Sequence, residues 1–279
     1  MDEVDGAVPV SRLHWLPVII FLWMPLSFLT TYLIAVQQNH VYPVFPAISD
    51  TGTLPPESCV FSLLVNILAL LLTFVIWLRG KQLRHVPSDV GPSRLANTGS
   101  YLIGYLACFG LYIVANCQET NTLFFHFVGA LMAFWSSFFY CLTQTWFSYW
   151  LINEMNSALI FIARAILCFA QLFLNVFTFY TFFVAVSLFK GNGSVGRSLK
   201  WGPDDPGWAW HLAATISEWC LAGCVALFVL TYYSDFKRLT LHPPTVKLIG
   251  YKYEMSREKK GSTCYSPRSE IPLDTTTRI

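Results

Sequence analysis

The chain has 279 residues, of which 54% are hydrophobic, 16% are aromatic and 12% are charged, with a formal net charge of +2. A soluble domain carries roughly 25% charged residues, so this chain lacks the groups that would cover a water-facing surface. The near-neutral charge argues against nucleic acid as a partner. The composition therefore predicts a polytopic membrane protein.

Six apolar blocks are long enough to cross about 30 Å of hydrocarbon as helices. The first block has an acidic leading segment and no small-residue cleavage pattern, so we expect an uncleaved span. The predicted spans are residues 16–36, 59–78, 97–115, 123–146, 165–189 and 212–233. The predicted fold class is all-α, with a bundle of six transmembrane helices in residues 1–241 and a polar, disordered tail at 242–279.

Lys and Arg residues are distributed unevenly between the two sides of this topology. Fifteen of them, including Arg79 after the second predicted span and Arg164 before the fifth, fall on the side that carries both termini. The opposite side holds only Lys190, Arg197 and Lys200. Because basic residues stay in the cytosol, the sequence predicts two cytosolic termini and a luminal or extracellular connection between the first two spans.

Two short patterns add candidate sites outside the spans. Asn192 begins an Asn-Gly-Ser sequon on the predicted luminal side, which makes it a candidate for N-glycosylation. Thr277 and Ile279 fit a C-terminal ligand for a PDZ groove. Both patterns also arise often by chance.

Glu218 is the acidic residue that lies well inside a predicted span, where an ionised carboxylate is unfavourable unless it is paired or hydrated. It could fasten two helices together or take part in function, and the sequence leaves both interpretations open. Small and polar residues also follow one face of the fourth span, which favours a helix-packing seam. They are His126, Ala130, Ala133, Ser137, Cys141 and Gln144.

The predicted topology gathers ten polar residues toward the luminal side as a candidate ligand site. They are Asp50, Thr51, Thr53, Glu57, Asn116, Gln118, Glu119, His126, His211 and Glu218. Such groups could bind a polar head group, respond to pH through the histidines, or perform acid–base chemistry. The sequence shows no nucleophile with a partnering base, no metal-ligand pair at helical spacing and no phosphate-binding glycine loop. We therefore expect no enzyme activity, catalytic residue, metal or cofactor.

The connection between the first two spans is polar and turn-rich. A Pro-Pro pair suits the first turn of the following helix, and Glu57 complements the positive end of that helix. Gly52 permits a turn that brings Asp50 back toward the membrane. The segment is therefore predicted to form a lid over Glu218 and His126.

Five segments in order carry a pattern that covers most of residues 16–241. They are Ile48-Ser49-Asp50-Thr51-Gly52-Thr53 with Pro55-Pro56-Glu57-Ser58; Cys108-Phe109-Gly110 with Ile113-Val114-Ala115-Asn116-Cys117-Gln118-Glu119; His126 with Gly129-Ala130; Trp201 with Pro203, Asp205 and His211; and Glu218-Trp219 with Leu230-Thr231-Tyr232 and Asp235-Phe236. This series resembles the damage-regulated autophagy modulator family. The chain departs from the family at Cys117, where an aromatic residue is usual, at Gly202, where an Asn is usual, and in the tail at 243–279.

The resemblance implies six helices, residence in lysosomal or endosomal membranes, and a positive, non-enzymatic role in autophagy and linked cell death. The plasma membrane and the Golgi are further locations, and membrane lipids and autophagy proteins are the expected partners. The wider superfamily includes proteins of GPI-anchor lipid remodelling and of phosphoinositide-kinase organisation. Two alternatives therefore stay open: a protein that remodels or transfers lipid at the luminal cluster, and a membrane scaffold that holds a cytosolic kinase through its tail.

Overall fold

The structure is a computed structural model that describes residues 9–87, 89–152, 154–189 and 199–242. This part of the chain is helical, and six of its helices are long and apolar enough to cross a membrane, which confirms the predicted fold class. The helices are α1 (Trp15–Gln37), α2 (Glu57–Arg84), α3 (Arg94–Asn116), α4 (Glu119–Trp150), α5 (Ala158–Leu188) and α7 (Trp208–Leu230), to which are added the short α8 (Tyr232–Phe236) and the 3-10 turn η1 (Asp50–Gly52).

Most helices extend past the predicted spans. Helix α2 continues to Arg84 and α4 already begins at Glu119. A hydrophobic block marks only the lipid-facing part, whereas the helix itself continues until its last backbone groups find other partners. Ser93, for example, begins α3 by accepting a hydrogen bond from the amide of Ala96 at 3.1 Å.

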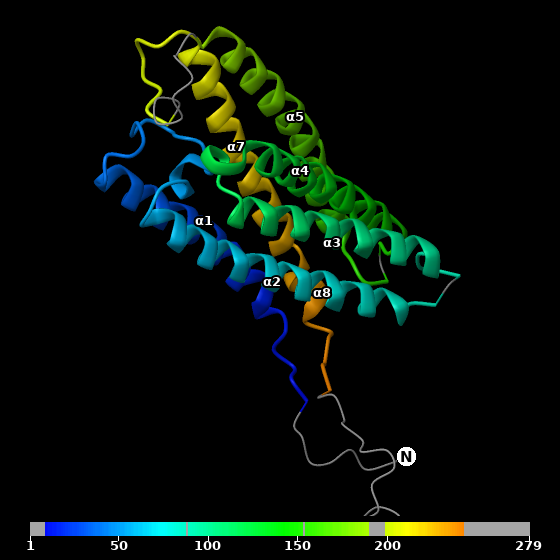
Figure 1. The fold of residues 1–279 in the computed structure, drawn as a ribbon. Helices are drawn as coiled ribbons and strands as arrows, with labels where there is room; N and C mark the ends of the chain where they lie inside the picture. The colour runs from blue at the N-terminus through cyan, green and yellow to red at the C-terminus, as the bar shows by residue number, and fades with distance from the viewer. Residues whose placement is uncertain (1–8, 88, 153, 190–198, 243–279) are drawn as a thin grey trace, which may run out of the picture. The chain divides into compact units, whose positions relative to one another are not determined.

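Helices that follow one another in sequence pack side by side, and α1 closes the bundle against α7 (Figure 1). The connections between α1 and α2, between α3 and α4, and before α7 lie at one end, here called the loop end. The connections after α2 and after α4 lie at the other end, here called the terminal end. The amide of Val10 donates to the carbonyl of Leu241 at 2.9 Å near that terminal end.

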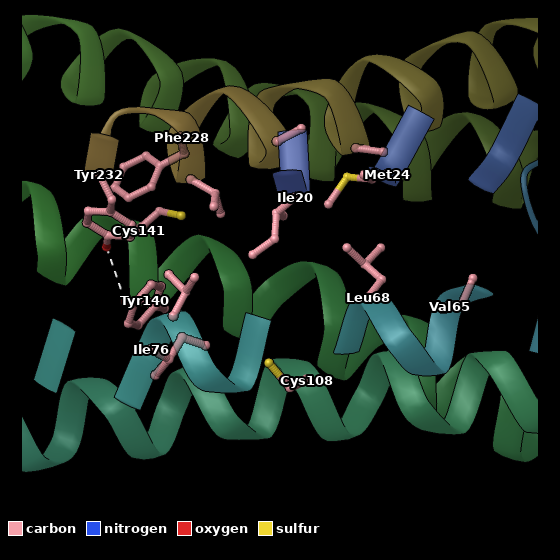
Figure 2. Close-up of a cluster of buried hydrophobic side chains, with 14 of the residues drawn as sticks. Ile20, Met24, Val65, Leu68, Ile76, Cys108, Tyr140, Cys141, Phe228 and Tyr232 are labelled. Atoms are coloured by element: carbon pink, nitrogen blue, oxygen red, sulfur yellow. Dashed lines mark hydrogen bonds between the residues drawn. The ribbon is translucent and has the colours of Figure 1, made fainter. Parts of the chain in front are cut away.

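Apolar side chains from α1, α2, α3, α4, α7 and α8 fill the centre of the bundle (Figure 2). Those labelled are Ile20, Met24, Val65, Leu68, Ile76, Cys108, Tyr140, Cys141, Phe228 and Tyr232. Helices α3 and α4 also touch through their backbones, since a Cβ atom on Gly110 would lie 2.5 Å from the nitrogen of Ala133. Such close approach is how small residues join helices in a membrane.

A buried ion cluster joins the helices at the terminal end. Asp235 forms ion pairs with Arg164 and with Arg79, whose Nη1 lies 3.3 Å from Oδ1 of the carboxylate, and all three side chains are fully buried. The ring of Tyr232 lies 5.4 Å from the guanidinium carbon of Arg79 and 4.8 Å from that of Arg164. Both arginines lie within the helices, next to the ends of the predicted spans, and buried partners from other helices compensate their charge.

Candidate functional site

The connection at residues 38–56, here called the first loop, folds against α1 and α2 at the loop end. Asp50, Thr51 and Thr53 are buried in it. Oδ2 of Asp50 accepts a hydrogen bond from the amide of Ala47 at 3.3 Å, and the Thr51 hydroxyl donates to the carbonyl of Ile48 at 2.7 Å. Polar residues can be buried here because the turn satisfies them with its own backbone.

Gly52 brings the first loop into direct contact with the start of α2. A Cβ atom at this position would lie 2.3 Å from Cγ of Phe61, so a larger residue would displace the aromatic ring. The hydroxyl of Thr51 also lies 3.1 Å from that of Thr31 on α1. Packing therefore requires the glycine here, whereas the turn does not, since Gly52 has no positive φ.

Helix α7 fastens the first loop from the other side. The amide of Ile48 donates to Oε2 of Glu218 at 3.1 Å, and the indole of Trp219 donates to the carbonyl of Pro46 at 3.0 Å. The sequence left the partner of Glu218 open, and the structure supplies a backbone amide from a segment far away in the chain. This hydrogen bond gives the intramembrane carboxyl group a structural role.

Three carboxyl groups converge beneath the first loop. The hydroxyl of Ser49 donates to Oε2 of Glu119 at 3.0 Å, and Asp50 lies next to Glu119 and Glu218. Burial raises the pKa of Asp50 well above its usual value, and the charges of Glu119 and Glu218 raise it further. Asp50 therefore keeps its proton to a higher pH than an exposed aspartic acid does, and in that form it can donate a hydrogen bond to a neighbouring carboxylate.

Two histidines, His126 and His211, join these carboxyl groups in one cluster of polar side chains. Nδ1 of His126 lies 2.7 Å from the carbonyl oxygen of Cys117, so it donates this hydrogen bond and leaves Nε2 facing Glu119 at 3.9 Å. His211 stacks on Trp201 with ring centroids 4.5 Å apart. Within the described residues, the buried Nδ1 atom of His211 has no hydrogen-bond partner.

Glu57 takes no part in this group of side chains. Its carboxylate is fully buried and lies 2.5 Å from Nδ1 of His40, which comes from the first loop. The pair holds the start of α2 against the loop. Sequence reasoning missed His40, because nothing in its neighbourhood marks it as the partner of a residue 17 positions later.

The other predicted site residues also lie elsewhere. Asn116 is exposed and exchanges amide hydrogen bonds with Asn66 on α2, at 3.0 and 3.1 Å. Gln118 accepts a hydrogen bond from Asn121 at 3.3 Å, and Thr53 donates to a backbone carbonyl of the first loop. Of the ten predicted residues, these three together with Thr51 and Glu57 lie outside the cavity described next.

The remaining five predicted residues, with Ser49 and Thr215, lie at one end of an internal cavity of about 260 Å³. The rest of its wall is mainly apolar and reaches Tyr232 near the terminal end. On α4, the small residues Ala130, Ser137 and Cys141 line this cavity. Two other residues of the predicted seam contact α3: the nitrogen of Ala133 lies against Gly110, and Gln144 donates to the hydroxyl of Ser100 at 2.9 Å. The small face of α4 therefore packs on α3 in part and lines the cavity in part.

Among the described residues, no group of three His, Cys, Asp or Glu side chains could hold a metal ion. Asn192, Thr277, Ile279 and the tail at 243–279 lie outside the described residues.

A family model, the Frag1/DRAM/Sfk1/Cwh43P N-terminal domain, matches residues 12–239. DNA damage-regulated autophagy modulator protein 2 of Rattus norvegicus is 32% identical over 231 residues, which are 82% of this chain and 85% of that relative. The chain belongs to the DRAM family.

Other DRAM-family relatives align over a similar part of the chain. DNA damage-regulated autophagy modulator protein 1 of Homo sapiens is 31% identical over 236 residues, covering 83% of this chain and 94% of the relative. Modulator of macroautophagy TMEM150B of Danio rerio is 28% identical over 239 residues, covering 85% and 91% respectively. No solved structure matches.

The segments that resemble the DRAM family are also those that the fold brings together. Residues 48–53 form the buried part of the first loop, and Glu218 and Trp219 fasten that loop to α7. Asp235 lies at the centre of the ion cluster at the terminal end. The family pattern therefore marks contacts that hold the bundle together at both ends.

Proposed function

We propose that this protein is a multi-pass protein of lysosomal or endosomal membranes that promotes autophagy and the cell death linked to it. The observation that carries the proposal is family membership, because relatives that align over more than four-fifths of the chain are named as modulators of autophagy. The protein acts without catalysis, through lipid or protein partners. The site supports this, since the carboxyl groups of Asp50, Glu119 and Glu218 are engaged by the first loop itself.

We place the loop end on the luminal side and both termini in the cytosol. The basic residues support this orientation, because most of those described lie toward the terminal end, where the positive-inside rule would keep them cytosolic. They include Arg12, Lys81, Arg84, Arg94, Lys237 and Arg238. Lys200 lies in the connection before α7, at the loop end. In an endolysosome, the first loop would then face an acidic compartment.

The proposal is tested in cells that lack the protein and in cells that re-express it with a tag. We expect the tagged protein in purified lysosomes and a reduced autophagic flux in its absence, measured as degradation of an autophagosome cargo with and without lysosomal inhibition. A protein truncated after residue 242 should restore this flux. If the protein instead held a cytosolic kinase through its tail, the truncated protein would not restore it. The proposal would be contradicted if the tagged protein lay outside endolysosomes and autophagic flux were unchanged in cells that lack it.

The cavity favours a second candidate function, the handling of lipid. Its apolar wall could accommodate a hydrocarbon chain while the polar group at the loop end contacts a head group. Remodelling or transfer should then require Glu218 and His126, and replacing them by Gln and Ala should abolish lipid turnover in reconstituted membranes. Unchanged lipid profiles in cells without the protein would count against this candidate.

A further inference from the structure

The cavity extends along α7. Its wall follows α7 from Glu218 through Ala222 and Val225 to Tyr232. At 1.5 Å per residue, this stretch is roughly 20 Å long. The volume of about 260 Å³ lies just below the range of roughly 300–1,000 Å³ that is usual for ligand pockets. These dimensions suit one extended hydrocarbon chain and leave too little room for a lipid with two chains.

The polar end of the cavity is acidic. Asp50, Glu119 and Glu218 all line it, and no Lys or Arg is among its lining residues. Only one oxygen of Glu218 receives a hydrogen bond from the described residues, so the other is free to accept one. The ring of His211 also lines this end of the cavity, and its buried Nδ1 atom has no hydrogen-bond partner in the part of the chain that the structure describes. A ligand head that donates hydrogen bonds and carries positive charge would satisfy these groups, whereas a phosphate would be repelled.

The cavity wall also reaches the outer surface of the bundle. Leu123 on α4 is 65% exposed, Phe127 on the same helix is 43% exposed, and Phe182 on α5 is 38% exposed, yet all three line the cavity. They lie near the loop end of the two helices. A molecule dissolved in the membrane could therefore enter between α4 and α5 without passing through water.

We propose that this cavity binds a single-chain membrane amphiphile with a protonated amine head, its nitrogen between Asp50, Glu119 and Glu218 and its chain extended toward Tyr232. Whichever of the three carboxyl groups are ionised supply charge-assisted hydrogen bonds to the ammonium group, and a protonated Asp50 accepts one through its carbonyl oxygen. The apolar wall surrounds the chain and removes it from lipid. This inference uses the same cavity as the lipid-handling candidate, but it requires no chemical step and holds whether or not lipid is turned over.

The test uses the full chain in phosphatidylcholine nanodiscs and a photoreactive derivative of octadecylamine. Unlabelled octadecylamine, octadecanol and octadecanoic acid compete for labelling, so that only the head group differs between competitors. We expect the amine to compete at a concentration at least tenfold lower than the alcohol, and the acid to compete least. The label should be found on α7 between Ala222 and Tyr232. Equal competition by the three compounds would overturn the proposal.

Three variants make the test specific. Glu218→Gln removes charge but keeps an oxygen for the amide of Ile48, and it should weaken competition by the amine about tenfold. Ala222→Phe fills the cavity below the head and should prevent labelling. Asp204→Asn is the control, since this exposed carboxyl group near the loop end lies outside the cavity, and it should bind as the unaltered protein does. Full labelling of Ala222→Phe would place the amine on the outer surface and contradict the proposal.

The outcome can be separated from that of the proposed cellular role. Should Glu218→Gln fail to fold, the ranking of the three head groups and the position of the label in the unaltered protein still decide the question. Unchanged autophagic flux in cells without the protein would remove the cellular role while leaving amine binding intact. Absence of head-group discrimination would remove only the inference about the ligand.

Discussion

At the scale of single residues, the ionisation of Asp50 should make the stability of the first loop depend on pH. The carboxyl groups of Glu119 and Glu218 and the ring of His126 also line this end of the cavity. Burial and the two neighbouring carboxylates raise the pKa of Asp50. An acid whose pKa is raised by folding stabilises the folded state below its unfolded pKa of about 3.9, and this contribution is lost as pH rises through the folded pKa. The first loop should therefore be bound more tightly in acidic solution.

Replacing Asp50 by Asn tests this pH dependence. We expect the unfolding temperature of the unaltered protein to fall as the pH is raised from acidic to neutral, and the Asp50→Asn variant to show a smaller fall because an amide cannot ionise. Each kcal/mol of lost stability should lower the unfolding temperature by roughly 2–4 °C for a chain of this size. Thermal unfolding in detergent across this pH range provides the measurement.

The matched control is Asp204→Asn, which changes an exposed carboxyl group near the loop end. It should keep the pH dependence of the unaltered protein. The other titratable groups around Asp50 are present in every sample. A difference between the two variants in how the unfolding temperature depends on pH therefore reports the ionisation of Asp50. Identical slopes for Asp50→Asn and the unaltered protein would show that this residue does not couple stability to pH.

At the scale of helices, the ion cluster holds α8 against α2 and α5. Arg164 also donates from Nε to the hydroxyl of Thr231 at 2.8 Å and from Nη1 to that of Ser148 at 2.5 Å, while Arg79 donates to Gln144 at 3.1 Å. Two guanidinium groups thus share one carboxylate in a fully buried site. Such an arrangement depends on all of its members, because a buried charge that loses its partner is strongly unfavourable.

Asp235→Asn keeps the shape of the side chain and removes its charge. We expect the variant to lose about 3–5 kcal/mol of stability, since two buried arginines would lose their counter-charge. Denaturant unfolding in detergent micelles, followed by size-exclusion chromatography of the folded fraction, measures this loss. Arg84→Gln serves as the comparison, because Arg84 is exposed and its change should fall within about 0.5 kcal/mol. Equal stability of the two variants would show that the cluster contributes nothing.

At the scale of the whole molecule, the orientation in the membrane decides which end of the bundle a given partner can reach. The first loop and the acidic end of the cavity share the loop end. Most of the described basic residues lie toward the other end. With the orientation proposed above, a lipid or luminal signal would act on the first loop, and cytosolic proteins would meet the connections after α2 and α4.

Single cysteines report this orientation. Val44 in the first loop and Asp89 after α2 are both exposed, so Val44→Cys and Asp89→Cys should be reactive once a reagent reaches them. In cells with a permeabilised plasma membrane and intact organelles, we expect an impermeant maleimide to modify Asp89→Cys, and Val44→Cys only after detergent is added. The unaltered protein corrects for its own cysteines. The reverse pattern would invert the proposed topology.

The sequence by itself determined the six helices, because the length and apolarity needed to cross a membrane are local properties of the chain. It also identified Gly52 as a turn residue and gathered Asp50, Glu119, His126, His211 and Glu218, since topology alone places them toward one end. Motifs spread over most of the chain were sufficient to indicate the DRAM family.

Only the tertiary structure decided which of these polar residues meet. Glu57 pairs with His40, Asn116 lies on the surface, and Arg79 and Arg164 are buried around Asp235. Whether the small face of α4 packs on a helix or lines a cavity also depends on how far α4 lies from its neighbours. Periodicity shows which residues share a face, but the partners of that face come from distant segments, and their distance is set by the packing of the whole bundle.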